Sequence, residues 1–336
     1  MPSSPGQLIF YAWSGSPWAS KVVAYLAFRG IPYTLCEQPI TLPRPDLASL
    51  GLKYRRIPVL AWGRDIYCDT SLIIAKLEKW IDSMNYKAIG ARDSTGKALE
   101  HLLEKWTDVA VFGPAAGAIP SSLELVQDPG FQKDREELWG RPWTKEEQDR
   151  LRPAGLASLR GNFDFLEGLF GDGRKWVNGG DSPGLADIHS AWIFSWMLSL
   201  PNGLPEDFFS TKDYPKTRAW IKRYDDALAA AQKAAPQPNK IKGPEALKKV
   251  TSADFVSQGD LQVEEDPTGL TFEQKVEMFP IDTGSKQRDA GKLVILKKSE
   301  MAISTKTQKG DAEVRIHYPR FNFSVGPPTT RADGNY

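Results

Sequence analysis

The sequence has little of the residues that build covalent or metal-held frameworks. Its 336 residues include two cysteines, Cys36 and Cys68, and three histidines. Two thiols cannot supply a disulfide framework, and both lie in or beside predicted strands, where we expect burial. The histidines, His101, His189 and His317, are far apart and have no ligand spacing with either cysteine, so we expect no zinc or iron site. His189 lies in an apolar stretch and is expected in the core.

Long apolar runs and an excess of charge of one sign are also missing. No stretch of about 18 apolar residues occurs, so we expect no transmembrane helix. The opening MPSSPGQ lacks the basic and apolar regions of a secretory signal peptide. Lysine and arginine number 43 against 42 acidic residues, a net charge of +1, which provides no general field for nucleic acid or a membrane surface. We therefore expect a reduced, soluble, cytoplasmic protein with neither kind of partner.

Residue patterns divide the chain into an α/β region, an all-α region and a β-rich region. Residues 1–88 alternate strand and helix signals, in the stretches QLIFYAW, PWASKVVAYLAFRG, PYTLCEQ, IPVLAWG, IYCD and TSLIIAKLEKWIDSM. Their order is β-α-β, a loop, then β-β-α. Residues 89–235 carry helical periodicity. Within them Pro153 marks a kink or a break, and residues 113–130 are loop-like.

The last region, residues 236–336, differs in composition from the first two. PQPNKIKGP is a linker by its proline and glycine content, and short alternating runs follow it, among them QKVEMF, GKLVILKK and AEVRIHYPRFNFSV. Val314 and Ile316 alternate with Arg315 and His317, which predicts a half-buried strand. We expect a small β-rich appendage that ends in a disordered tail, GPPTTRADGNY.

The stretch SGSPWASKVV places a serine at the start of the first predicted helix. Pro17 suits the first helical position, so Ser16 precedes the first turn. Ser16 either caps the helix or holds its hydroxyl over a bound anion, which the helix dipole favours. Ser14, two residues earlier, is a second candidate for that role.

Four stretches, in this order of elements, resemble the glutathione S-transferases. They are SGSPWASKV at the first helix, RPDLASL in the following loop, RRIPVL before the third strand and CDTSLIIAKL after the fourth. The similarity extends over residues 7–235 and is strongest to the serine-type and the fungal omega- or etherase-like members. It implies a thioredoxin-like N-terminal domain, an all-helical second domain and bound glutathione. The β-rich region has no counterpart in ordinary members.

The resemblance assigns roles to particular residues. Ser16 would donate a hydrogen bond to the glutathione sulfur and favour its thiolate. Pro58 would follow a cis peptide bond, so that the Ile57 backbone can pair with the cysteinyl part of glutathione. Asp69 and Thr70, at the start of a helix, would bind the charged ends of the γ-glutamyl group.

Further candidates concern the glycyl end of glutathione and the second substrate. Arg44 lies where related proteins place a basic residue near the glycyl carboxylate, with Arg55 and Arg56 as competitors. Trp18 also fits the core-facing stripe of its helix. Four aromatic residues are expected to wall the site of a hydrophobic co-substrate: Trp13, Trp18, Trp106 and Phe112.

A serine at position 16 limits the chemistry. Because Ser16 cannot form a mixed disulfide, a thiolate reaction here must use the sulfur of glutathione. We expect a transferase that attacks a hydrophobic electrophile, by conjugation or by cleavage of an ether or thioether. A glutathione-dependent cis-trans isomerase and a non-catalytic ligand-binding or regulatory module remain alternatives. The resemblance further implies a homodimer.

Overall fold

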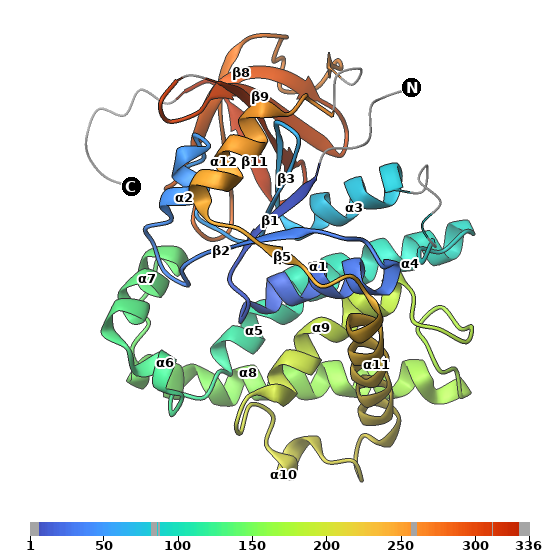
Figure 1. Ribbon diagram of the computed structural model, residues 1–336. Helices are drawn as coiled ribbons and strands as arrows, with labels where there is room; N and C mark the ends of the chain where they lie inside the picture. Colours follow the sequence, from blue (N-terminus) through green and yellow to red (C-terminus); the bar gives the residue numbers. More distant parts are fainter. Residues whose placement is uncertain (1–6, 82–85, 87, 257–260, 311, 329–336) are drawn as a thin grey trace.

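The first quarter of the chain forms the expected β-α-β-β-α unit. The computed structural model describes residues 7–81, 86, 88–256, 261–310 and 312–328 (Figure 1). The elements of this unit are β1 (Leu8–Ala12), α1 (Pro17–Arg29), β2 (Thr34–Glu37), α2 (Pro45–Ser49), β3 (Val59–Trp62), β4 (Asp65–Cys68) and α3 (Thr70–Ile81). Strand β1 pairs in parallel with β2 and antiparallel with β3. The short helix α2 is an addition to the predicted order, which has a loop there.

The ends of α1 follow from local chemistry. Ser16 has extended backbone angles and its Oγ accepts the Ala19 amide at 3.3 Å, while Pro17 occupies the first helical position. Gly30 ends the helix with a φ of 67°, in the left-handed region that glycine adopts readily. The helix therefore starts at the residue that the motif predicts.

The all-helical half lies below the sheet in Figure 1. Its elements are α4 (Ser94–Lys105), the π-helix η2 (Trp106–Val111), α5 (Phe112–Gly117), α6 (Glu124–Gln127), α7 (Pro129–Trp139), α8 (Lys145–Leu169), η3 (Phe170–Asp172), α9 (Leu185–Ser199), α10 (Glu206–Phe209) and α11 (Pro215–Ala234). Helix α9 is buried on nearly all sides, as its apolar sequence predicts. None of the helices among the described residues is long and apolar enough to span a bilayer.

One expectation for this half was wrong, and one of the two alternatives for Pro153 is excluded. Residues 113–130 are not a loop, because they contain most of α5, all of α6 and the start of α7. Pro153 does not break its helix, since α8 continues for 25 residues with the proline inside. A proline removes one backbone donor, and the buried face of this long helix, with Leu159 and Phe163 in the core, stabilises the rest.

The remaining chain adds strands to both edges of the same sheet. Its elements are β5 (Asn239–Lys240), α12 (Gly243–Ser252), β6 (Gln262–Val263), β7 (Lys275–Pro280), β8 (Asp289–Leu296), β9 (Glu300–Lys306), β10 (Glu313–Pro319) and β11 (Phe323–Gly326). The strand order is β11-β7-β8-β9-β10-β4-β3-β1-β2-β5, with β6 beside β8. Strand β5 pairs with β2 and β10 pairs with β4, both in parallel.

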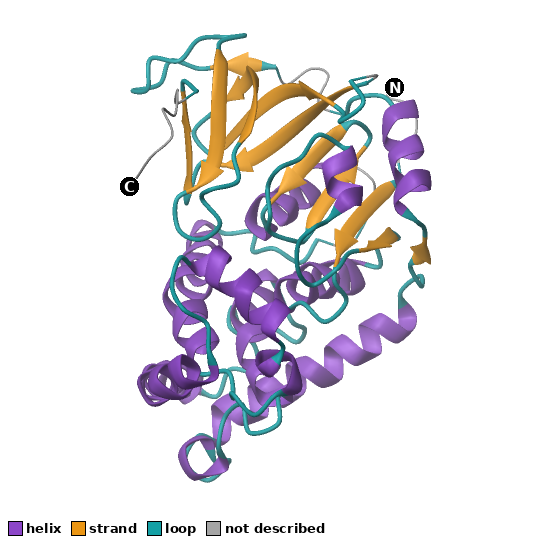
Figure 2. Ribbon diagram, turned by 90° about the vertical axis from the view of Figure 1, so that its left-hand side faces the viewer, coloured by secondary structure: helices purple, strands orange, loops and turns teal. Residues whose placement is uncertain are grey.

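This C-terminal segment, residues 236–328, is therefore continuous with the thioredoxin-like sheet and is not a separate appendage (Figure 2). One core cluster draws on both parts of the chain: Ile9, Tyr11, Val59 and Ile66 from the first strands, and Met278, Leu293, Ile303 and Ile316 from the last. The predicted half-buried strand at residues 314–317 is buried on both faces, because α3 covers the side that was expected to meet solvent. Most of the predicted disordered tail lies outside the described residues.

A buried charge network joins the two parts at the β4–β10 pair. Both ring nitrogens of His317 on β10 form hydrogen bonds of 2.8 Å. Nε2 bonds Asp65 Oδ1, and Nδ1 bonds Glu300 Oε1. Lys76 on α3 lies 2.6 Å from Glu300 Oε2. Burial opposes charge on the imidazole, but its hydrogen bonds to the two carboxylates raise the pKa of His317. The network thus fixes the register of a strand pair whose members are about 250 residues apart in sequence.

Candidate functional site

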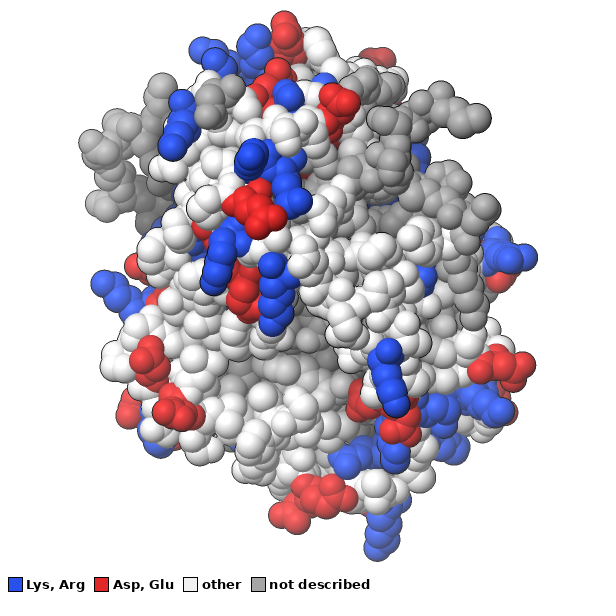
Figure 3. Space-filling model, in the orientation of Figure 1, with Lys and Arg blue, Asp and Glu red and all other residues white. Residues whose placement is uncertain are grey.

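A cavity of about 440 Å³ lies between the sheet and the helical half. Its walls come from the start of α1, the turn before β3, the start of α3, helices α4 to α7, and two loops of the C-terminal segment. Figure 3 shows this face of the molecule hollowed near its middle, with charges of both signs interspersed over the upper half. The cavity brings together nine of the ten residues that the sequence assigned to a site.

Ser16 lies on the cavity wall at the N-terminus of α1, with a relative exposure of 7%. Its Oγ accepts a hydrogen bond from the Ala19 amide, so the hydroxyl proton can point toward the cavity. The competing residue, Ser14, is exposed, and its Oγ donates to Glu37 Oε2 at 2.5 Å. This geometry favours Ser16 as the hydroxyl that meets a ligand.

The expected cis peptide bond is present between Ile57 and Pro58, and both residues line the cavity. Asp289 of β8 supports the turn that precedes them: its carboxylate accepts the amides of Lys53 at 2.6 Å and Tyr54 at 3.1 Å. Burial raises the pKa of Asp289 to about 6. The C-terminal segment therefore holds the backbone of the turn in place.

The start of α3 presents polar groups to the cavity. Asp69 has a φ of 74°, and its Oδ1 accepts the amide and the hydroxyl of Ser71 at 3.0 and 2.6 Å. Thr70 is 2% exposed, and its Oγ1 has no hydrogen-bond partner among the described residues. A buried hydroxyl without a partner is costly. Thr70 lies at a helix N-terminus, where amide groups also point outward and negative charge is favoured.

The three candidate arginines are held differently. Arg44 donates to the carbonyls of Pro39 at 2.9 Å, Ile40 at 2.8 Å and Arg55, so its guanidinium is largely committed to backbone. Burial lowers the pKa of Arg44 to about 10. Arg55 pairs with Asp134 at 3.0 Å. All three line the cavity, and the assignment of one of them to the glycyl carboxylate stays a prediction.

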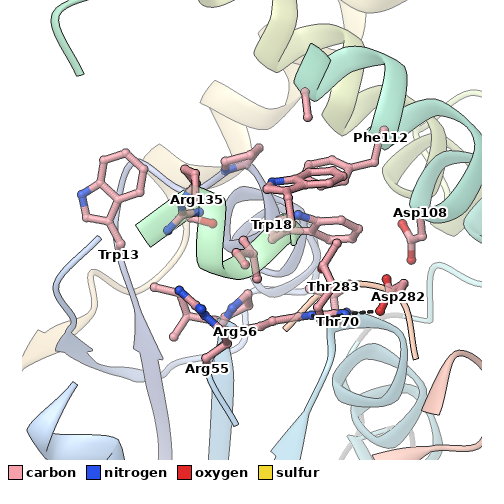
Figure 4. A pocket seen from close by; sticks show the side chains of 18 of the residues that line it. Trp13, Trp18, Arg55, Arg56, Thr70, Asp108, Phe112, Arg135, Asp282 and Thr283 are labelled. Carbon is pink, nitrogen blue, oxygen red and sulfur yellow. Dashed lines mark hydrogen bonds and ion pairs between the residues drawn. The ribbon is translucent and has the colours of Figure 1, made fainter. Parts of the chain in front are cut away.

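Arg56 runs along the floor of the cavity toward the C-terminal segment (Figure 4). Its Nε donates to the Thr283 carbonyl at 3.0 Å, and its Nη2 donates to Asp282 Oδ1. Four residues of this segment line the cavity: Asp282, Thr283, Phe321 and Asn322. Sequence reasoning missed them, because nothing in their local pattern indicates that these loops return to the first helix and the third strand.

Aromatic side chains form the wall opposite the polar groups. The ring centroids of Trp18 and Phe112 are 4.7 Å apart, and Phe112 stacks on Trp139 at 6.0 Å. Trp13 also lines the cavity. The prediction that Trp106 walls the co-substrate site is wrong, because Trp106 is absent from the described cavity wall. It packs instead on Phe165 and Phe194, with ring centroids 5.2 and 5.9 Å away. Within η2, Asp108 and Val109 line the cavity instead.

The same turn presents Asp108, another residue that sequence reasoning missed. Its carboxylate oxygens lie 2.7 and 2.9 Å from Nζ of Lys21, a fully buried side chain on α1. Burial raises the pKa of Asp108 to about 7, against the opposing charge of Lys21. This pair connects the helix that carries Ser16 to the helical wall of the cavity.

The two cysteines lie away from this chemistry. Both are buried and free, as expected. Burial raises the pKa of Cys36 to about 12 and that of Cys68 well above the usual range. Neither thiol is therefore ionised near neutral pH, and neither lines the described cavity.

Comparisons with known proteins match this arrangement. Residues 10–80 match the glutathione S-transferase N-terminal domain, and residues 114–233 match a domain of unknown function, DUF7962. Prostaglandin E synthase 2 of Danio rerio is 23% identical over 66% of this chain and 71% of its own. Glutathione S-transferase U4 of Arabidopsis thaliana is 23% identical over 70% of this chain and 90% of its own.

Solved structures show the same fold. A GST-like protein from Pseudomonas syringae matches with a TM-score of 0.69 at 23% identity, covering 96% of this chain and all of that one (100%). The β-etherase LigF from Sphingobium sp. strain SYK-6 matches with a TM-score of 0.52 at 15% identity, covering 68% of this chain and 100% of its own. The first match includes the C-terminal strands, whereas the second spans a smaller part. Residues 10–80 therefore match the glutathione S-transferase N-terminal domain, and the chain as a whole has a GST-like fold whose sheet is extended by a β-rich C-terminal segment.

Proposed function

We propose that this protein is a glutathione-dependent transferase. In it, Ser16 stabilises the thiolate of glutathione, and the aromatic wall around Trp18 and Phe112 receives a hydrophobic electrophile. One observation carries the proposal: a hydroxyl at a helix N-terminus lines the same cavity as the cis Ile57–Pro58 turn and the Thr70 hydroxyl, which has no hydrogen-bond partner in the part of the chain that the structure describes. The polar groups that would bind a peptide thus lie across the cavity from its apolar, aromatic wall.

The chemistry follows from the position of Ser16. Since its Oγ accepts the Ala19 amide, its own proton is available to a sulfur anion. A free thiol has a pKa of about 8.5, and a hydrogen bond at a helix N-terminus lowers it. The thiol proton leaves to solvent, a sulfur lone pair forms the new bond to carbon, and the leaving group departs with the electrons of the bond that breaks. Cys36 and Cys68, buried and protonated, do not compete.

The test is a titration of the bound thiol, followed by the ultraviolet absorbance of the thiolate. With wild-type protein we expect the pKa of bound glutathione to lie below about 8.5. A charge-assisted hydrogen bond contributes about 1.5–3 kcal/mol, so Ser16→Ala is expected to raise that pKa by about 1 to 2 units. The same variant should lower kcat/KM for an aryl halide about 10- to 100-fold.

Ser14→Ala is the matched control, because this serine is two residues away and bonds Glu37 at the surface. It is expected to leave both the thiol pKa and the rate unchanged. Tight binding of glutathione with an unshifted thiol would support a non-catalytic module. Failure to bind glutathione would refute the proposal. Assays with an aryl ether and with a conjugated cis alkene would separate ether cleavage and isomerisation from simple conjugation.

A further inference from the structure

The backbone before the cis Ile57–Pro58 bond is held by a carboxylate of the C-terminal segment. Asp289, the first residue of β8, is 1% exposed. Its Oδ1 accepts the Lys53 amide at 2.6 Å, and its Oδ2 accepts the Tyr54 amide at 3.1 Å. These amides begin a stretch, residues 53–58, whose last five residues line the cavity. The course of this cavity-lining backbone therefore depends on a residue more than 230 positions later in the sequence.

Side-chain contacts with the same segment hold this stretch as well. The ring of Tyr54 packs on Tyr318 of β10 and Phe323 of β11, with ring centroids 5.4 and 6.1 Å away. Nε of Arg56 donates to the Thr283 carbonyl in the loop between β7 and β8 at 3.0 Å. Residues 53–58 are thus fixed from several directions by one part of the chain, and Asp289 provides the contact with their backbone amides.

The groups around Asp289 leave it as the one that changes charge most readily. It is faced by Lys53 and Tyr54 of the turn, by Tyr318 of β10, whose hydroxyl donates to Asp289 Oδ2, and by Cys68 of β4. Burial raises the pKa of Asp289 to about 6, against its hydrogen bonds and the charge of Lys53. Burial also raises the pKa of the thiol and of both phenols well above the usual range, so these three stay neutral.

Protonation of Asp289 would remove part of this support. An ionised carboxylate only accepts hydrogen bonds, whereas in a protonated carboxyl one oxygen becomes a donor. One of the amides of Lys53 and Tyr54 then loses its acceptor, and a buried amide without an acceptor is costly. The observed backbone of residues 53–58 is therefore most stable when Asp289 is ionised.

We infer that Asp289 is a positioning residue for glutathione. Through the amides of Lys53 and Tyr54 its ionised carboxylate sets the backbone of Ile57, which would pair with the cysteinyl part of the peptide. The inference rests on the proposed function, since it concerns the same ligand. Asp289 is absent from the described cavity wall, so it acts through residues 53–58 and not by contact with the ligand.

The experiment uses S-methylglutathione, in which a methyl group replaces the thiol proton, so the sulfur cannot ionise. Calorimetry gives its dissociation constant at pH 5 and at pH 7. We expect wild-type protein to bind about 3- to 10-fold more weakly at pH 5, because one proton with a pKa of about 6 removes the binding form. The pKa values of Asp108 and His317 are also raised, so variants must identify the titrating group.

Asp289→Asn cannot ionise and keeps one acceptor oxygen. It is expected to bind the peptide about 3- to 10-fold more weakly than wild type at pH 7, with affinities at the two pH values that agree within about twofold. Tyr318→Phe removes the hydroxyl that donates to Asp289 and helps to lower its pKa. The midpoint of the pH dependence should therefore move upward by about 1 unit. This second variant keeps the test open even where Asp289→Asn does not fold.

Asp187→Asn is the matched control. Asp187 is also a buried carboxylate that accepts two backbone amides, those of Val177 and Gly184, each at 3.0 Å. It is absent from the described cavity wall. A variant that only loses stability should resemble this control, which is expected to keep the wild-type affinity and the wild-type dependence on pH.

The outcomes separate the inference from the proposed function. If wild-type protein binds S-methylglutathione equally at both pH values, the inference is wrong and the proposed function stands. The same holds if Asp289→Asn keeps the wild-type ratio, or if Tyr318→Phe leaves the midpoint unchanged. If wild-type protein binds neither glutathione nor its S-methyl derivative, the proposed function itself is wrong, and the inference is overturned with it.

Discussion

Lys21 forms a buried ion pair with Asp108, a residue of the cavity wall. Its side chain is fully buried, its amino group contacts both oxygens of Asp108, and the charge of Lys21 helps to lower the pKa of Glu104, against burial, to about 2. Removing one member of a buried ion pair leaves the other charge uncompensated in a medium of low polarity. The lysine therefore allows a carboxylate to line the cavity.

We expect Lys21→Met to lower the free energy of unfolding by about 3–5 kcal/mol. Urea unfolding followed by circular dichroism measures this. The control is Lys222→Met on α11, where the partner Asp226 lies 2.6 Å away but both side chains are largely exposed. Loss of such a surface pair should cost less than about 1 kcal/mol. Equal effects of the two substitutions would contradict the role assigned to Lys21.

Residues whose role is set by local chemistry were predictable from the sequence. Ser16 and Pro17 mark the start of α1, and the Ile57–Pro58 bond is cis as the motif implies. Asp282 was not predictable, because its place at the cavity depends on pairings between strands from opposite ends of the chain. Trp106 was assigned to the wrong surface, because an aromatic residue near the cleft in sequence can equally pack within the helical half, as it does on Phe165 and Phe194.

At the scale of elements, the β4–β10 pair is held by groups that titrate. The pKa of His317 is raised by Asp65 and Glu300, which outweigh burial, so its protonated form stabilises the fold. That contribution is complete below the unfolded pKa of about 6.5 and is lost as the pH rises through the higher folded value. Glu300 behaves oppositely, because its hydrogen bond to His317 outweighs burial and lowers its pKa to about 2. Its contribution is present above the unfolded pKa of 4.5 and is lost progressively as the pH falls from there to about 2.

We therefore expect the stability of the wild type to fall as the pH rises above about 6.5, with a slope of at most about 1.4 kcal/mol per pH unit for one proton. His317→Gln should lack this component while being less stable at pH 6. Chemical unfolding at several pH values measures both. His101→Gln, at an exposed position on α4, should retain the wild-type slope. A His317→Gln variant with the wild-type slope would show that another group titrates.

The β-strand pattern of the C-terminal segment was predictable, but its partners were not. Alternation at Val314 and Ile316 identifies a strand, and both residues are in the core. Arg315 and His317 were expected to face solvent, and both are buried. Alternating polarity marks the apolar face, whereas only the tertiary packing of α3 on this strand decides what covers the polar one.

At the scale of the molecule, the C-terminal segment closes both edges of the sheet. Strand β5 covers β2 and strand β10 covers β4, so the thioredoxin-like unit has no open edge at either strand. The homodimer implied by the family resemblance remains a prediction for analytical ultracentrifugation. Because β10 pairs with β4, the edge of β4 is not available for pairing with a second subunit.

A chain that ends at residue 235 is expected to lose cooperative folding. It would expose the first-strand side of a core cluster that the last strands complete, together with two strand edges. Near-ultraviolet circular dichroism and dye binding measure the loss. As a single-site companion, Ile316→Ala should cost about 2–5 kcal/mol. A truncated chain that stays monomeric and melts cooperatively would show that the first two regions fold by themselves.

The pairing of β4 with β10 has a consequence for biosynthesis. Asp65 is translated early, and His317, its hydrogen-bond partner, is translated 252 residues later. The β4 edge of the nascent thioredoxin-like unit therefore stays uncovered until β10 has been translated. Contacts of such long sequence separation form slowly, and an uncovered strand edge in the interim invites chaperone binding. A chain that stops before β10 would consequently expose this edge permanently.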